Sequence, residues 1–190
     1  GATPFDFDGD ADLDVYVSCF AGVNLLHRNN GTGQFRSIPG ALGMASDGAS
    51  IAALPADADG DGRLDLYVIN ALNQANQLYM SRGAGADTRY RETTSAAGLD
   101  VAGNSSGGAW GDFDNDGDED LLVSNVAMPI QVYRNDGDAS FTDVTGAAVD
   151  VAQLPGAGTT GVAIDDIDRD GDIDVFLTSP RNNDVLLVND

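Results

Sequence analysis

The chain has 190 residues, a hydrophobic fraction of 42 % and a formal net charge of −22, with 31 Asp and Glu against 9 Arg and no Lys. This length and composition allow a sizeable core, and the acidic balance argues against nucleic-acid binding, which needs a basic patch. The single cysteine, Cys19, excludes an intrachain disulfide, and no run of 18 apolar residues predicts a membrane span.

The acidic residues are concentrated in a recurring motif. Twenty of the 31 fall in four nine-residue segments with Asp at positions 1, 3, 5 and 9: residues 6–14, 57–65, 112–120 and 166–174. A uniformly acidic, halophile-like surface would not concentrate its charge in this way. The segments start 51, 55 and 54 residues apart, and a period near 50 residues indicates a repeat architecture.

The chemistry of the motif favours a hard cation. Carboxylates spaced by two along a tight loop can turn their oxygens toward one centre, and Ca²⁺ takes six to eight oxygen ligands at about 2.3–2.6 Å. Mg²⁺ would demand near-octahedral geometry and keep more water, whereas Zn²⁺ would favour His or Cys, which the motif lacks. The sequence therefore predicts up to four Ca²⁺ sites.

Each unit predicts the same short strands, because runs of β-branched and aromatic residues favour strands over helices. In each unit a segment rich in Gly, Ala and Ser leads into the acidic loop, and an apolar run follows the loop. Where a fourth run is present, a turn that contains Gly separates it from the third, which indicates a hairpin. In chain order the predicted strands are 1–5, 15–17, 24–28 and 35–38; 48–54, 66–69, 77–80 and 90–93; 107–111, 121–123, 131–134 and 141–144; 161–164, 175–177 and 185–188. Leu26, Leu78, Val132 and Leu186 are predicted to hold one register.

Four antiparallel strands per repeat are typical of a β-propeller blade. A parallel β-helix with calcium turns is the main rival, but its repeats are near nine residues. The prediction is an all-β chain with one repeat domain, 1–190, and about three and a half blades: approximately 1–45, 46–100, 101–150 and 151–190, the last without its outer strand. Such a chain could be part of a larger ring, could be completed by another chain, or could close alone as a small or distorted ring.

The loop, together with the run Val132-Tyr133-Arg134-Asn135-Asp136-Gly137 and the later Phe141-Thr142-Asp143-Val144-Thr145, resembles the FG-GAP or VCBS repeat of integrin α-like propellers. It is most similar to the cartilage acidic protein and UnbV-like branch, over essentially the whole chain. The resemblance implies that the loop joins the first two strands of a blade, that positions 1, 3, 5 and 9 bind calcium through side chains, and that position 7 binds through its backbone carbonyl.

The ligands implied by the resemblance can be named in each unit. The side-chain ligands are Asp6, Asp8, Asp10 and Asp14; Asp57, Asp59, Asp61 and Asp65; Asp112, Asp114, Asp116 and Asp120; and Asp166, Asp168, Asp170 and Asp174. The carbonyl ligands are Asp12, Arg63, Asp118 and Asp172. Two departures occur in the first unit: Ala11 replaces the position-6 Gly, where a positive φ is expected, and a short approach of five residues precedes the loop.

The sequence favours a structural role for the metal and no catalytic residue. Every clustered carboxylate pair is already explained by metal binding, and His27 has no obvious nucleophile partner. Trp110 and the repeated tyrosines are interpreted as strand core rather than as a sugar-binding face. The expected protein is a secreted, periplasmic or cell-surface module for adhesion, recognition or assembly, with a protein or carbohydrate ligand and possible self-association through open blade edges. The alternatives are a partial propeller of a polysaccharide-acting enzyme and a filament or surface-layer subunit.

Overall fold

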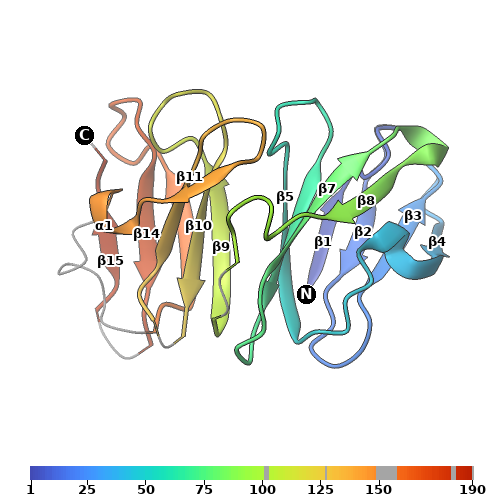
Figure 1. The fold of residues 1–190 in the computed structure, drawn as a ribbon, viewed down its shortest axis with the longest axis horizontal. Coiled ribbons are helices and arrows are strands. Elements are labelled where there is room, and N and C mark those ends of the chain that lie inside the picture. The colour runs from blue at the N-terminus through green and yellow to red at the C-terminus, as the bar shows by residue number, and fades with distance from the viewer. Residues whose placement is uncertain (101–102, 127, 149–157, 181–182, 190) are drawn as a thin grey trace.

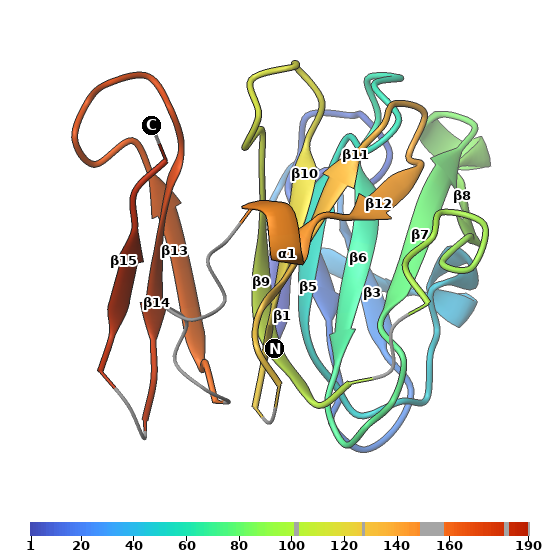
Figure 2. The same ribbon diagram turned by 60° about the vertical axis from the view of Figure 1, so that its left-hand side comes forward.

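The computed structural model describes residues 1–190 except 101–102, 127, 149–157, 181–182 and 190. Its strands form four separate antiparallel sheets that follow one another along the chain (Figures 1 and 2). The first three sheets have four strands each, and the fourth has three within the described residues. The predicted all-β class and the four-stranded blades are therefore confirmed, and the predicted boundary between blades three and four, at 150/151, lies outside the described residues.

The strands are short, as the sequence predicts. The first blade consists of β1 (Ala2–Phe5), β2 (Asp14–Val17), β3 (Leu25–Asn29) and β4 (Phe35–Ile38); the second of β5 (Ser50–Ala56), β6 (Asp65–Asn70), β7 (Gln77–Arg82) and β8 (Arg89–Glu92). The third consists of β9 (Ser105–Gly111), β10 (Asp120–Asn125), β11 (Gln131–Asn135) and β12 (Phe141–Asp143); the fourth of β13 (Gly161–Asp165), β14 (Asp174–Thr178) and β15 (Val185–Leu187). The inner strand of the first blade has four residues against seven in β5 and β9, so its predicted shortness is confirmed.

Helical structure is minor. It consists of 3-10 turns at Pro39–Gly43 and Gly85–Asp87 and the four-residue helix α1 (Thr145–Ala148) within the described ranges. None of these segments has the length and apolar character needed to cross a membrane.

Neighbouring blades contact each other through their first strands. β1 contacts β5, β5 contacts β9, and β9 contacts β13, so successive inner strands lie side by side. Side chains reinforce this order: the Thr3 hydroxyl donates to the carbonyl of Ala53 at 2.9 Å, and Trp110 Nε1 donates to the carbonyl of Leu54 at 3.1 Å. This arrangement is that of consecutive propeller blades.

The register across each blade is the same. The residue pairs on the second and third strands are Tyr16–Leu26, Tyr67–Leu78, Leu122–Val132 and Phe176–Leu186. The predicted common register of the third strands is therefore confirmed. Because side chains alternate between the two faces of a strand, this register fixes which residues face the next blade.

The hydrophobic core lies between the blades. Leu66 and Val68 pack toward Tyr16 of the first blade, whereas Tyr67 and Ile69, which alternate with them, pack toward the third blade. Between the third and fourth blades the buried residues are Leu122, Ile130, Val132, Val175 and Leu177. Each fully buried aliphatic or aromatic side chain contributes on the order of 1.5–3 kcal/mol, so the blades stabilise one another across these faces.

Trp110 marks the boundary between the second and third blades. Its ring lies edge-on to Tyr67 with centroids 6.0 Å apart, and 5.8 Å from the ring of Phe141. Tyr16, Tyr67, Tyr79 and Tyr133 are at most 3 % exposed. The interpretation of these four tyrosines as core is therefore confirmed, and the partly buried Trp110 packs against the core cluster that contains Tyr67 and Tyr133.

Candidate metal centres

The four acidic loops occupy equivalent places. Each connects the first strand of a blade to the second, as the resemblance implies. Figures 1 and 2 show all four loops at the same end of the stacked sheets. The repeat therefore places a cluster of carboxylates at one end of every blade.

The aspartate at position 1 closes the loop. Asp57 illustrates the pattern: Oδ1 accepts from the backbone nitrogen of Asp61 at 3.0 Å, and Oδ2 accepts from that of Gly62 at 2.7 Å. Asp6, Asp112 and Asp166 accept from the same two loop positions. An aspartate that satisfies backbone N–H groups four and five residues ahead holds the chain in a tight turn.

The aspartate at position 5 tightens the second half of the loop. Oδ1 of Asp10, Asp61, Asp116 and Asp170 accepts from the backbone nitrogen of position 7 at 3.0 Å in all four blades. These bonds hold the backbone nitrogen of position 7, whereas its carbonyl lies in the following peptide unit. Its predicted role as a ligand in Asp12, Arg63, Asp118 and Asp172 stays a prediction.

The aspartate at position 9 joins the loop to the third strand. Asp120 Oδ2 accepts from the backbone nitrogen of Phe113, at position 2 of its own loop, at 3.0 Å, and Oδ1 accepts from that of Asn135 at 2.7 Å. The equivalent pairs are Phe7 and Asn29 for Asp14, Ala58 and Ser81 for Asp65, and Ile167 and Asn189 for Asp174. These four carboxylates are at most 2 % exposed.

Burial and hydrogen bonding compete in setting the protonation of position 9. Burial raises the pKa of Asp14 to about 6, that of Asp65 to about 7 and that of Asp120 to about 6, although the backbone N–H bonds oppose the shift. In the fourth blade the hydrogen bonds from Asn189 and Ile167 dominate, and they lower the pKa of Asp174.

In the first two loops the aspartate at position 3 carries an oxygen that the protein leaves unsatisfied. Oδ1 of Asp8 and Oδ1 of Asp59 are buried and accept no hydrogen bond. Burial raises the pKa of both carboxyls, and that of Asp168 as well. A buried carboxylate oxygen without a donor is costly unless a cation compensates it. The first two loops therefore have the oxygen ligands and the unmet acceptor that a hard cation fits.

The carboxylates also converge. Ligand oxygens lie within 4.8 Å of one another in Asp6, Asp8 and Asp10; Asp57, Asp59 and Asp61; Asp112, Asp114 and Asp120; and Asp166, Asp168 and Asp174. Oxygens on opposite sides of Ca²⁺ lie about 4.8 Å apart when each bond is near 2.4 Å. The first two loops thus bring together positions 1, 3 and 5, and the last two bring together positions 1, 3 and 9.

Two arginines lie close to the first two clusters, and the sequence reasoning missed them. Arg28 Nη2 lies 2.8 Å from Asp8 Oδ2 and 2.9 Å from Asp10 Oδ2, and Arg82 Nη1 lies 3.2 Å from Asp59 Oδ2. Arg63, within the second loop, pairs with Asp61. Since Arg28 and Arg82 lie in the third strands of their blades, proximity in sequence does not reveal them.

The backbone of each loop is left-handed at two positions. At position 6 the φ angles are 69° for Ala11, 84° for Gly62, 99° for Gly117 and 107° for Gly171, so the positive φ expected there is confirmed. Position 4 is also left-handed, with φ of 77° at Gly9, 68° at Gly60, 61° at Asn115 and 70° at Arg169. Gly and Asn tolerate the left-handed region, so their presence at position 4 of three loops could have predicted a positive φ there. Arg169 breaks the pattern in the fourth loop.

Consecutive antiparallel blades, each with an acidic loop between its first two strands, define the class of β-propeller repeat proteins. The chain belongs to the FG-GAP-like repeat family, whose profile matches residues 6–68, 57–123 and 112–177. Each match starts at position 1 of one loop and ends in the second strand of the following blade.

Curated relatives agree with this assignment. The chain is 28 % identical over 183 residues to Cartilage acidic protein 1 of Mus musculus, covering 87 % of this chain and 26 % of that protein. It is 28 % identical over 145 residues to Cartilage acidic protein 1 of Homo sapiens, covering 70 % and 22 %. The corresponding protein of Xenopus tropicalis is 29 % identical over 145 residues. The chain thus spans between 22 % and 26 % of the length of these relatives.

Proposed function

We propose that the four loops bind Ca²⁺ and that the ions stabilise a propeller module whose work is extracellular recognition. The observation that carries the metal assignment is the pair of buried, donor-less oxygens on Asp8 and Asp59, each within a cluster of converging carboxylates. Bound Ca²⁺ would supply the positive charge that these oxygens lack. The protein residues provide the rest: position 1 closes the loop and position 9 anchors it to the third strand.

The charge of the chain supports the same proposal. Four divalent ions would reduce the formal charge of −22 to about −14. Because each loop holds at least four carboxylates within nine residues, much of the relief falls where like charges are closest. Binding to the folded loops then adds directly to the stability of the fold.

An extracellular binding role fits better than catalysis. Extracellular calcium-binding modules work with dissociation constants of about 10⁻⁴–10⁻³ M, which suits oxygen-ligand sites of this kind. The relatives are named as cartilage acidic proteins, which favours a secreted or cell-surface setting. We therefore infer a non-enzymatic module that recognises a protein or carbohydrate of the matrix or cell surface.

The metal assignment is tested by calorimetric titration of the chelator-treated chain with Ca²⁺, and with Mg²⁺ as the comparison. The expected result is uptake of up to four Ca²⁺ with weaker or no uptake of Mg²⁺. Equal binding of both ions would contradict the calcium assignment, and no uptake of either would contradict metal binding altogether. A glycan and matrix-protein binding screen with and without Ca²⁺ then tests the recognition role.

Assembly through the fourth blade is a second candidate. Phe176 and Leu186 are 37 % and 44 % exposed, yet their register is that of Tyr67 and Leu78, which the next blade buries. The same face would fit a blade of a second copy of the chain. Sedimentation of the chain and of Phe176→Ser tests this: concentration-dependent dimers that the substitution removes would support it, and a monomer throughout would contradict it.

A further inference from the structure

Consecutive loops are joined by a side-chain donor at each of the three interfaces between blades. The acceptor is always the carbonyl of position 2 in the preceding loop: Phe7, Ala58 or Phe113. This carbonyl belongs to the peptide unit that leads into position 3, the aspartate whose Oδ1 is unsatisfied in the first two loops. The N–H of position 2 is held by the position-9 aspartate of its own loop. A group that binds the carbonyl therefore orients the peptide next to the proposed metal ligand.

Asn135 joins the second and third loops. Its Nδ2 donates to the carbonyl of Ala58 in the second loop at 2.9 Å and to that of Glu119 in the third loop at 3.2 Å. Its backbone nitrogen donates to Asp120 Oδ1 at 2.7 Å. Asn135 is 1 % exposed, so these bonds form away from competing water.

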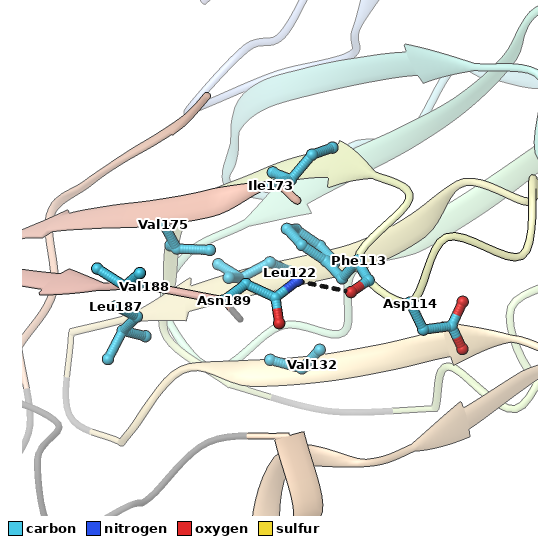
Figure 3. A pocket seen from close by; sticks show the side chains of 9 residues that line it. All are labelled: Phe113, Asp114, Leu122, Val132, Ile173, Val175, Leu187, Val188 and Asn189. Atoms are coloured by element: carbon cyan, nitrogen blue, oxygen red, sulfur yellow. Dashed lines mark hydrogen bonds between the residues drawn. The ribbon is translucent and has the colours of Figure 1, made fainter. Parts of the chain in front are cut away.

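Asn189 makes the same connection between the third and fourth loops. Its Nδ2 donates to the carbonyl of Phe113 at 2.9 Å, and its backbone nitrogen donates to Asp174 Oδ1 at 3.0 Å. Figure 3 shows this bond beside a pocket of about 260 Å³ between the two blades. The asparagine thus has the same register at two interfaces, and in both it binds the position-2 carbonyl of the preceding loop and the position-9 carboxylate of its own.

The interface between the first and second blades replaces the asparagine with another donor. Ser81 stands at the equivalent position, and its strand partner Tyr90 supplies the contact from β8. The Tyr90 hydroxyl lies 2.9 Å from the carbonyl of Leu64 and 3.4 Å from that of Phe7. These carbonyls occupy the same two loop positions that Asn135 contacts. Two chemically different side chains therefore meet one requirement, which indicates that the contact is a property of the repeat.

We propose that Asn135, Asn189 and Tyr90 are positioning residues that couple metal binding between neighbouring loops. The proposal rests on the proposed calcium function. Order in the third loop fixes Asp120, which fixes the backbone of Asn135, and the amide of Asn135 then holds the peptide that leads into Asp59. Filling one loop pre-organises its neighbour, and by linkage the effect is reciprocal.

The chemistry of the donors sets an order for the coupling. An amide Nδ2 has two protons and can serve both carbonyls at once, whereas a hydroxyl has one proton to share. Coupling should therefore be stronger between the second and third loops than between the first and second.

The experiment is a cycle of variants of the whole chain, titrated with Ca²⁺ by calorimetry. Asp59→Asn disables the second loop, and the fluorescence of Trp110, the single tryptophan, reports on the interface with the third blade. With Asn135 present, Asp59→Asn should weaken binding at the third loop by about fivefold or more, within the usual range of coupling. With Asn135→Ser, which copies the residue at position 81, Asp59→Asn should leave that affinity unchanged within about twofold.

Asn29→Ser is the matched control. Asn29 occupies the same register but donates to the carbonyl of Leu13 in its own loop. This substitution should leave the effect of Asp59→Asn intact. A role of Asn135 in stability alone would lower the melting temperature without changing the coupling.

Two results would overturn the proposal: an Asp59→Asn effect of equal size with Asn135 and with Ser at that position, or no effect in either. Wild-type chain that takes up no Ca²⁺ would instead overturn the proposed function and the coupling with it. Should Asn135→Ser fail to fold, Tyr90→Phe keeps the ring and removes only the hydroxyl. In that variant, disabling the first loop with Asp8→Asn should no longer weaken the second loop, and an undiminished effect would count against the proposal.

Discussion

Asp65 accepts a hydrogen bond from the backbone nitrogen of Ser81 at 2.7 Å, across 16 residues of sequence. Its other oxygen accepts from the backbone nitrogen of Ala58 at 3.0 Å. Both oxygens of this buried carboxylate therefore hold main-chain donors, and the same arrangement recurs in all four blades. Position 9 acts as a clamp between loop and strand, whereas position 3 of the first two loops, Asp8 and Asp59, has an Oδ1 that no protein donor meets.

This difference predicts that positions 9 and 3 respond differently to substitution in the chelator-treated protein. Asp120→Ala leaves the N–H groups of Phe113 and Asn135 without their acceptor, which costs roughly 1–3 kcal/mol for each buried donor. Asp8→Asn removes a desolvated charge and, with it, the ion pair to the partly exposed Arg28. Because these two effects oppose each other, the metal-free stability should change by less than about 1 kcal/mol. Urea unfolding in chelator measures both.

The same pair of variants separates the two roles when Ca²⁺ is present. Asp8→Asn should bind one ion fewer and lose the corresponding increase in melting temperature, although its metal-free stability is close to that of the wild type. A large loss of stability in Asp8→Asn with chelator present would show that position 3 also supports the fold without metal.

Removal of metal should lower the melting temperature strongly. A site filled at 100 times its dissociation constant stabilises the fold by about 2.7 kcal/mol, and for a chain of this size each kcal/mol corresponds to about 2–4 °C. Each occupied loop should therefore raise the melting temperature by roughly 5–10 °C. Scanning calorimetry with Ca²⁺ and then with chelator measures the difference. Identical curves would leave the acidity of the loops without a metal explanation.

The repeat period and the acidic spacing predicted the loops, and the short apolar runs between them predicted the strands and the register of the third strands. They could not predict the clamp made by Asp65, since its partner Ser81 lies on another strand and offers only a backbone N–H. The sequence also could not predict the side-chain donor that joins neighbouring blades. Tyr90, on the fourth strand of its blade, takes the place of the asparagine that the other two interfaces carry at the third strand. A contact through the main chain places little restriction on which side chain occupies the position. A single sequence therefore gives little indication of such contacts.

Arg28 should oppose Ca²⁺ binding at the first loop. Its guanidinium lies 2.8 Å from Asp8 and 2.9 Å from Asp10, and a positive charge this close disfavours a second cation. Arg28→Gln should tighten binding at the first loop several-fold at low ionic strength, with a smaller gain in high salt. Calorimetric titration at two salt concentrations measures the change.

Arg89→Gln is the control for this substitution, since Arg89 donates to the carbonyls of Ala86 and Thr88. It changes the net charge by the same amount at a different place. Equal gains in affinity for the two variants would mean that overall charge, rather than the contact of Arg28 with the loop, sets the strength of the site.

Glycine should stabilise the two loop positions where a residue other than Gly or Asn adopts a left-handed backbone. Ala11 has φ of 69° and Arg169 has φ of 70°, a region that costs a residue with a Cβ roughly 1–2 kcal/mol. Because glycine also adds entropy to the unfolded chain, Ala11→Gly and Arg169→Gly should each gain about 0.5–1 kcal/mol. Gly117→Ala, at φ of 99°, should destabilise. Urea unfolding of the three variants, all in excess Ca²⁺, tests whether the strain resides in the loop backbone, and a loss of stability in both glycine variants would contradict it.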